Sequence, residues 1–197
     1  MSFRKYLNLY HAALTRRSRR PSGDPSGRLL VVQVAPLGDA CTLVPVCLDL
    51  RAAGYTLDVV CRAGLEPLWH EFLPDAHVIG VRDGLWCRRG AESALATVLE
   101  RAYEGVFVTS MKPYAAYLGA LPAAHRRYGM IEERQYYSGA RGIFDRLYSA
   151  GRTEHVVKRF RGLFRLHADV ADKWDDSPRI PETPAESGTD GYVLIHP

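Results

Sequence analysis

The sequence predicts an α/β fold built on a doubly wound, Rossmann-like parallel sheet. Three observations lead to this prediction. Residues 29–32 are an unbroken apolar run, which is typical of a strand buried on both faces of a parallel sheet. Pro36, Gly38 and Asp39 form a tight turn directly after this run. Strand-like and helix-like segments then alternate at spacings that suit repeated βα units.

The first half of the chain supplies the clearest signals. Its predicted strands are apolar runs rich in β-branched residues and bounded by turn residues, and Gly54 ends the first helix. In order, we expect a strand at 29–32, a helix over about 40–53, a strand at 56–61, a short helix at 65–72 and a strand at 77–81.

The second half continues the alternation with one interruption. Residues 130–153 are polar and aromatic with weak periodicity, so we expect a long loop with helical turns there. The final helix places Val156, Phe160 and Leu163 at helical spacing. In order, we expect a helix near 91–103, a strand at 105–110, a helix at 114–121, a short strand at 125–129 and a helix over 154–167.

A chain of 197 residues can build one good core with room for arms, and hardly two. We expect residues 28–171 to form that domain. Residues 1–27 form a basic N-terminal arm and linker. Residues 172–190, rich in Pro, Asp, Glu and Ser, resemble an interdomain linker. Residues 191–197 contain the opening of another buried strand, so we expect the first strand of a truncated second domain.

Cysteine usage and hydropathy indicate a cytoplasmic protein. Cys41, Cys47, Cys61 and Cys87 show no C-x-x-C pairing, so neither zinc nor a disulfide framework is expected. No apolar run reaches the roughly 18 residues that span a bilayer, and the N-terminus lacks the apolar core of a secretion signal. Residues 2–17 can form a basic amphipathic helix, which lies at the inner membrane surface, packs on the domain or frays, and residues 21–27 are a flexible linker by composition.

Five segments in order resemble the N-terminal domain of family-nine glycosyltransferases, which include the lipopolysaccharide heptosyltransferases. The segments are RLLVVQVAPLGDACTLVPVCLDLRAAG, LDVVCRAGLEPLWHEFLPDAHVIGV, YEGVFVTSMKPYAAYLGAL, TEHVVKRFRGLF and YVLIHP. The similarity runs from about residue 28 to residue 197. It implies the GT-B fold, in which two Rossmann-like domains face each other across a cleft. This chain would hold the N-terminal, acceptor-binding half and would lack the donor domain.

The resemblance implies inverting transfer of a hexosyl or heptosyl group from a nucleotide sugar, such as ADP-heptose, to a cell-envelope saccharide. Asp39 would be the general base that takes the proton of the acceptor hydroxyl. The residues alone leave another role open, because Asp39 could simply cap a helix that begins at Ala40. No metal or other cofactor is implied: metal-ligand spacing is absent, and so is the D-x-D pattern of metal-dependent transferases.

Substrate-binding candidates flank this turn or carry positive charge. Gly38 would let the backbone approach a substrate, unless turn geometry alone requires it. Lys112 and Arg62 follow strands and could contact an acidic acceptor. Arg126 and Arg127 could do the same, with a solvated basic face as the alternative. His155 matches a histidine of the family, but we expect a packing or capping role.

Three other functions compete with glycosyl transfer. Asp58 lies twenty residues beyond Gly38, as a ribose-binding acid would in a nicotinamide enzyme, but the turn lacks G-x-G-x-x-G. A non-catalytic module that binds a saccharide or a membrane is the main alternative. Nucleic-acid binding through the basic arm lacks any recognised motif. The sequence names neither the sugar, the nucleotide nor the acceptor.

Overall fold

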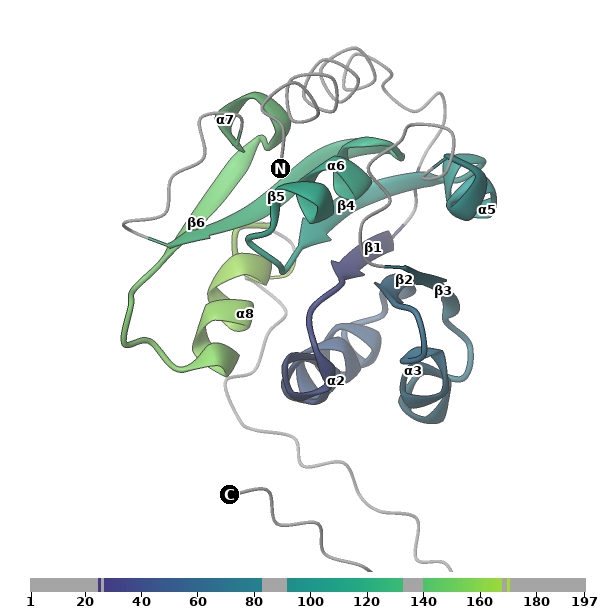
Figure 1. The fold of residues 1–197 in the computed structure, drawn as a ribbon, viewed down its shortest axis with the longest axis horizontal. Helices are drawn as coiled ribbons and strands as arrows, with labels where there is room; N and C mark the ends of the chain where they lie inside the picture. The colour runs from purple at the N-terminus through teal and green to yellow at the C-terminus, as the bar shows by residue number, and fades with distance from the viewer. Residues whose placement is uncertain (1–24, 26, 83–91, 133–139, 168–169, 171–197) are drawn as a thin grey trace, which may run out of the picture.

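The computed structural model describes residues 25, 27–82, 92–132, 140–167 and 170 (Figure 1). The expected linker and final strand, at 172–190 and 191–197, lie outside the described residues, as does nearly all of the N-terminal arm. The elements are β1 (Arg28–Gln33), α2 (Leu37–Ala52), β2 (Thr56–Arg62), α3 (Glu66–Phe72), β3 (His77–Val81), α5 (Ala96–Leu99), β4 (Ala102–Val108), α6 (Pro113–Ala120), β5 (Ala123–Glu132), α7 (Ala140–Ile143), β6 (Arg146–Ala150) and α8 (Val156–Phe164).

The six strands form one parallel sheet in the order β3-β2-β1-β4-β5-β6. β1 lies at the centre, where Val32 is opposite Val60 of β2 on one side and Val108 of β4 on the other. Strand order runs outward from β1 in both directions, so the sheet is doubly wound. The predicted fold class is confirmed.

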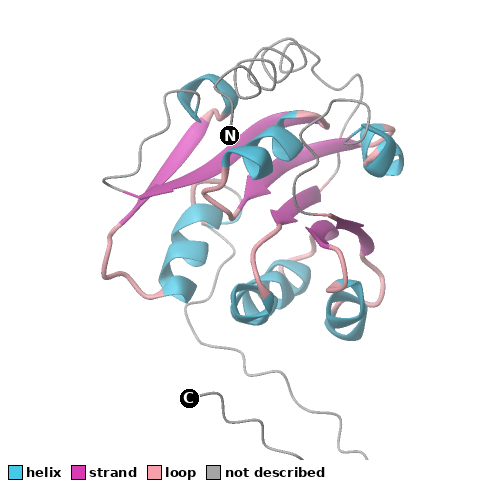
Figure 2. Cartoon of the chain, in the orientation of Figure 1, coloured by secondary structure: helices cyan, strands magenta, loops and turns pink. Residues whose placement is uncertain are grey.

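Helices cover both faces of this sheet (Figure 2). Leu30 and Val32 of β1 pack in a cluster that includes α6 residues, whereas Leu29 and Val31 pack in a second cluster with α2 and α8. Because both sets of β1 side chains are fully buried, the strand has no solvent-facing side. This explains the unbroken apolar run in its sequence.

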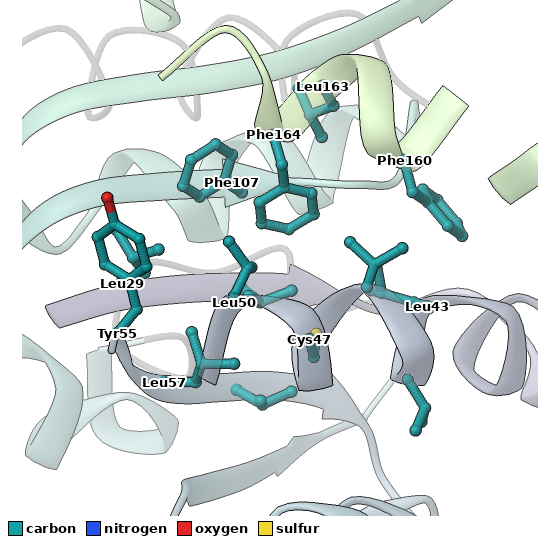
Figure 3. Packing of buried hydrophobic residues seen from close by; sticks show 14 of the residues in the cluster. Leu29, Leu43, Cys47, Leu50, Tyr55, Leu57, Phe107, Phe160, Leu163 and Phe164 are labelled. Carbon is teal, nitrogen blue, oxygen red and sulfur yellow. The ribbon is translucent and has the colours of Figure 1, made fainter. Parts of the chain in front are cut away.

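Aromatic rings fill the space between the sheet and α8. Phe107 of β4 stacks on Phe164 with ring centroids 4.3 Å apart and on Tyr128 of β5 at 4.6 Å. Figure 3 shows Phe107 and Phe164 beside Leu50 of α2. The α2 and α8 helices therefore share one core on this face.

Asp58 lies inside β2, where three donors satisfy its buried carboxylate. Arg28 Nη1 lies 3.4 Å from Oδ1, and Arg101 Nη1 and the Tyr103 hydroxyl each lie 2.8 Å from Oδ2. Burial, reinforced by the charge of Asp58, raises the pKa of Tyr103, so its hydroxyl stays protonated and donates. Asp58 is opposite His77, the first residue of β3, and so lies away from the carboxyl edge of the sheet. This placement argues against a ribose-binding role.

Several elements match the sequence prediction to within one residue at each end: β1, β2, α3, β3 and α6. The predicted helix near 91–103 is too long at its C-terminal end: residues 92–94 and α5 (Ala96–Leu99) are helical, but β4 already begins at Ala102. The loop predicted for 130–153 is wrong. It contains the end of β5, the short helix α7 and the strand β6. β6 is an edge strand with exposed and half-buried positions, so it lacks the apolar run of a central strand.

Close packing of α6 on β4 depends on Gly119, where an added Cβ would overlap Cγ2 of Val108. We expect Gly119→Ala to lower the free energy of unfolding by about 1–3 kcal/mol, because the helix must shift away from the sheet. Urea denaturation would measure the change. Gly151→Ala is the control, since its new Cβ would lie 3.7 Å from the nearest atom, Cβ of Glu154. Equal stability of the two variants would contradict this account of the packing.

Candidate functional site

The candidate site lies at the carboxyl edge of the sheet, between β1 and β4. In open α/β sheets, ligands bind at this edge where the strand order reverses. The chain leaves β1 for α2 on one face and leaves β4 for α6 on the other. Contacts join the two turns: Thr109 N donates to Val32 O at 3.2 Å, and the Tyr114 hydroxyl donates to Val34 O at 3.3 Å.

Asp39 lies in the first turn of α2. The helix begins at Leu37 with Pro36 as its N-cap residue, so the predicted start near residue 40, with Asp39 as a possible cap, is wrong. The position suits a carboxylate, because the positive end of the helix dipole lies there. Asp39 is half-buried. Within the described part of the chain, its carboxylate has no hydrogen-bond or ion-pair partner.

Gly38 is exposed, beside Asp39 in the same helical turn. Its φ lies outside the left-handed region, and a Cβ built on it would meet no atom within 4 Å. Neither backbone conformation nor packing within this structure therefore requires a glycine here. The alternative that turn geometry alone requires this glycine is therefore wrong, and approach of a substrate to Gly38 stays a prediction.

Two predicted basic residues lie on the same edge. Lys112 is the N-cap residue of α6 and is exposed. Arg62 is the exposed last residue of β2, next to β1. Arg62 at the end of β2, Asp39 at the start of α2 after β1, and Lys112 before α6 after β4 thus lie on one edge of the sheet, at three adjacent strands.

Arg126 and Arg127 lie apart from this group; the burial of Arg127 argues against contact with an acidic acceptor, whereas that role for the exposed Arg126 stays a prediction. Both lie within β5, because the strand begins at Ala123 and runs to Glu132. Arg126 is opposite Gly105, which in turn is opposite Leu29 near the start of β1. Arg127 is buried at 2% exposure, and its Nη2 donates to Pro122 O at 2.6 Å. Its role in this structure is to hold the chain between α6 and β5.

His155 caps α8, as the sequence analysis expected. It is the N-cap residue, and its Nδ1 accepts a hydrogen bond from Val157 N at 3.3 Å. The bond satisfies one of the backbone donors that every helix leaves unpaired at its start.

Three buried polar residues at the carboxyl edge were not singled out from the sequence: Gln33, Thr109 and Ser110. Thr109 Oγ1 donates to Val32 O at 3.2 Å, and Ser110 Oγ accepts from Lys112 N at 3.4 Å. A sequence signal existed, because Gln33 and Thr109 follow directly on the apolar parts of central strands and Ser110 comes next. Polar side chains in that position mark the end of a strand at its functional edge.

The buried cysteines Cys47 and Cys61 are unreactive, because their thiols stay protonated. Burial, with a contribution from Glu66, raises the pKa of Cys61 to about 12, and burial also raises the pKa of Cys47. Both thiols stay protonated and pack as small apolar groups. Cys41 is exposed, and Cys87 lies outside the described residues.

Among the residues that the structure describes, no three His, Cys, Asp or Glu side chains gather to hold a metal ion. None of the described helices has the length and apolarity to cross a bilayer.

Neither a protein-family model nor a curated protein sequence matches this chain. Solved structures do. The chain is similar to E. coli heptosyltransferase WaaC with ADP-2-deoxy-2-fluoro heptose, at a TM-score of 0.57 and 22% identity, over 71% of this chain and 47% of that one. It is similar to the same enzyme with ADP, at a TM-score of 0.56 and 22% identity, over 79% of this chain and 49% of that one.

The chain therefore spans about half the length of the solved structures it matches. At this level of identity the likeness establishes the fold. The chain has a Rossmann-like α/β fold that is also present in a heptosyltransferase.

The adjacent residues Arg126 and Arg127 offer a matched pair for stability measurements. We expect Arg127→Gln to lower the free energy of unfolding by about 1–3 kcal/mol, because Pro122 O would lose its buried donor. Arg126→Gln should change it by less than about 0.5 kcal/mol, because Arg126 is exposed. Thermal and urea unfolding would compare the two. Equal losses would show that Arg127 has no special structural role.

Proposed function

We propose that this chain is the acceptor-binding half of a GT-B glycosyltransferase of the heptosyltransferase-like family nine. In this proposal the enzyme of which this chain is one half transfers a sugar from a nucleotide-sugar donor, such as ADP-heptose, to a cell-envelope saccharide. One observation carries the proposal: a half-buried carboxylate, Asp39, stands at the strand-order reversal of a fold shared with heptosyltransferase WaaC. The solved structures of that enzyme contain ADP or a fluorinated ADP-heptose, which supports a nucleotide-sugar donor.

Asp39 would act as the general base of an inverting displacement. As the acceptor oxygen attacks the anomeric carbon, its proton passes to an Asp39 carboxylate oxygen, a new C–O bond forms, and the bond to the departing nucleoside diphosphate breaks with its electron pair. The first turn of a sixteen-residue helix holds the carboxylate rigidly. None of the described residues bonds to the Asp39 carboxylate, so its oxygens are open to the acceptor hydroxyl.

Lys112 and Arg62 would orient an acidic acceptor beside this base. Both are exposed on neighbouring turns of the same edge, so their charges face the solvent from which an acceptor arrives. We assign the nucleotide of the donor to a second Rossmann-like domain, whose first strand we expect at 191–197. We assign peripheral membrane contact to residues 1–27, on their basic amphipathic pattern.

Replacement of the proposed base gives the main test. We expect Asp39→Asn to reduce transfer by about 10²–10⁴-fold, because the amide cannot accept the proton. The fold should persist, since Asn has the same shape. The measurement is product formation by mass spectrometry, in the full-length natural protein with a panel of nucleotide sugars. Asp75→Asn is the matched control, because Asp75 is 81% exposed and pairs only with Arg51 in the described structure.

Unchanged turnover in Asp39→Asn would exclude this residue as the base. If the unmodified protein binds saccharide but transfers nothing from any donor, the non-catalytic binding module is the better description.

Gly38→Ala separates stability from function. The free protein has room for a methyl group at residue 38, and Ala favours a helix more than Gly does. The free energy of unfolding should therefore stay the same or rise by up to about 1 kcal/mol. If the acceptor approaches the backbone here, the KM for the acceptor should rise at least about tenfold. Steady-state kinetics would measure it. An unchanged KM would show that no substrate comes close to Gly38.

A further inference from the structure

Gln33 is the exception in a strand that is otherwise apolar. It is the last residue of β1, directly after the buried run at 29–32, and its side chain is fully buried. A buried carboxamide needs partners for its oxygen and for both of its N–H groups. In Gln33 the carboxamide oxygen has a partner among the described residues, but the N–H groups do not.

The two ends of the carboxamide differ. Oε1 accepts a hydrogen bond from Ala35 N at 3.2 Å. Nε2 has no hydrogen-bond partner among the described residues. A buried donor without a partner lowers the stability of the folded state, and an apolar side chain of the same shape would avoid the loss. Stability of the fold alone therefore does not explain a glutamine at this position.

The bond to Ala35 controls the turn that leads to Asp39. Pro36 has no N–H, so Ala35 is the last residue before α2 whose backbone can donate to a fixed acceptor. The Tyr114 hydroxyl holds the preceding carbonyl, Val34 O, from the α6 side. Gln33 and Tyr114 thus fix two consecutive residues of the turn, and Asp39 follows in the first helical turn.

We propose that Gln33 is a positioning residue: its Oε1 fixes Ala35 and thereby sets where α2 presents the Asp39 carboxylate. The effect of Gln33 on catalysis rests on the proposed function, in which Asp39 is the base. The part that concerns the turn can be tested without any activity.

The first experiment measures amide hydrogen exchange by NMR in the full-length natural protein. Gln33→Met keeps the length of the side chain but removes the acceptor. We expect the Ala35 amide to exchange about fivefold faster or more, with little change in global stability. Gln33→Glu keeps an acceptor oxygen but buries an acidic group. It should lower global stability and yet keep Ala35 protected relative to the rest of the core.

Tyr148→Phe is the control, because it removes one hydrogen bond, from the Tyr148 hydroxyl to Glu154 Oε1, at the edge strand β6. It should leave exchange at Ala35 unchanged. Unchanged exchange of Ala35 in Gln33→Met would overturn the proposal, and so would equal acceleration in the Met and Glu variants.

The second experiment uses the kinetics of sugar transfer. We expect Gln33→Met to lower kcat about tenfold to a hundredfold with KM nearly unchanged, because a misplaced base slows the chemical step without weakening binding. A raised KM with unchanged kcat would overturn the positioning role. If the unmodified protein shows no transfer, the proposed function fails, and the exchange experiment still decides whether Gln33 holds the turn.

Discussion

Burial of β1 on both of its faces is the constraint on which the rest of the structure depends. A strand that shows apolar side chains on both sides must be covered by helices above and below the sheet. Leu30 and Val32 meet α6 and its neighbours, and Leu29 and Val31 meet α2 and α8. The helices that follow β1 and β4 must then leave on opposite faces. The carboxyl edge between these two strands is therefore where the turns diverge and where Asp39 and Lys112 stand.

Most of the sheet could be predicted from the sequence, including the edge strand β3, whereas the other edge strand, β6, could not. Residues 29–32 and 56–61 carry strong apolar or β-branched signals because their strands are buried. Residues 77–81 carry one because Val78 and Ile79 of β3 still pack against the two apolar clusters. Among the described strands β6 pairs with β5 alone, and its side chains are mostly exposed or half-buried, so nothing in its five residues marks a strand. Its place depends on contacts between segments far apart in sequence, which no local pattern records.

The candidate site divides in the same way. Asp39, Gly38, Lys112 and Arg62 could be placed on one edge because each follows a recognisable strand. Arg127 could not be interpreted from its charge alone. Its guanidinium is buried against Pro122 O, and that depends on where the chain enters β5.

The buried polar groups at the two ends of the sheet differ in how fully their hydrogen bonds are satisfied. Both carboxylate oxygens of Asp58 have a donor, whereas at the carboxyl edge Nε2 of Gln33 has no partner within the described part of the chain. Such local departures from the best packing are expected where a fold carries function.

The return of α8 onto the α2 face has a consequence for how the protein is made. Phe107 and Leu50 belong to the first two thirds of the chain, yet their core is completed by Phe160 and Phe164 near the end of the described chain. Arg161 also reaches back to the nearly buried carboxylate of Asp49, with 3.5 Å between Nη2 and Oδ2. A ribosome that has released only the first 150 residues therefore holds a nascent domain with an open apolar face. Chaperones would meet that face before α8 emerges, and this domain would complete its core only once α8 has emerged.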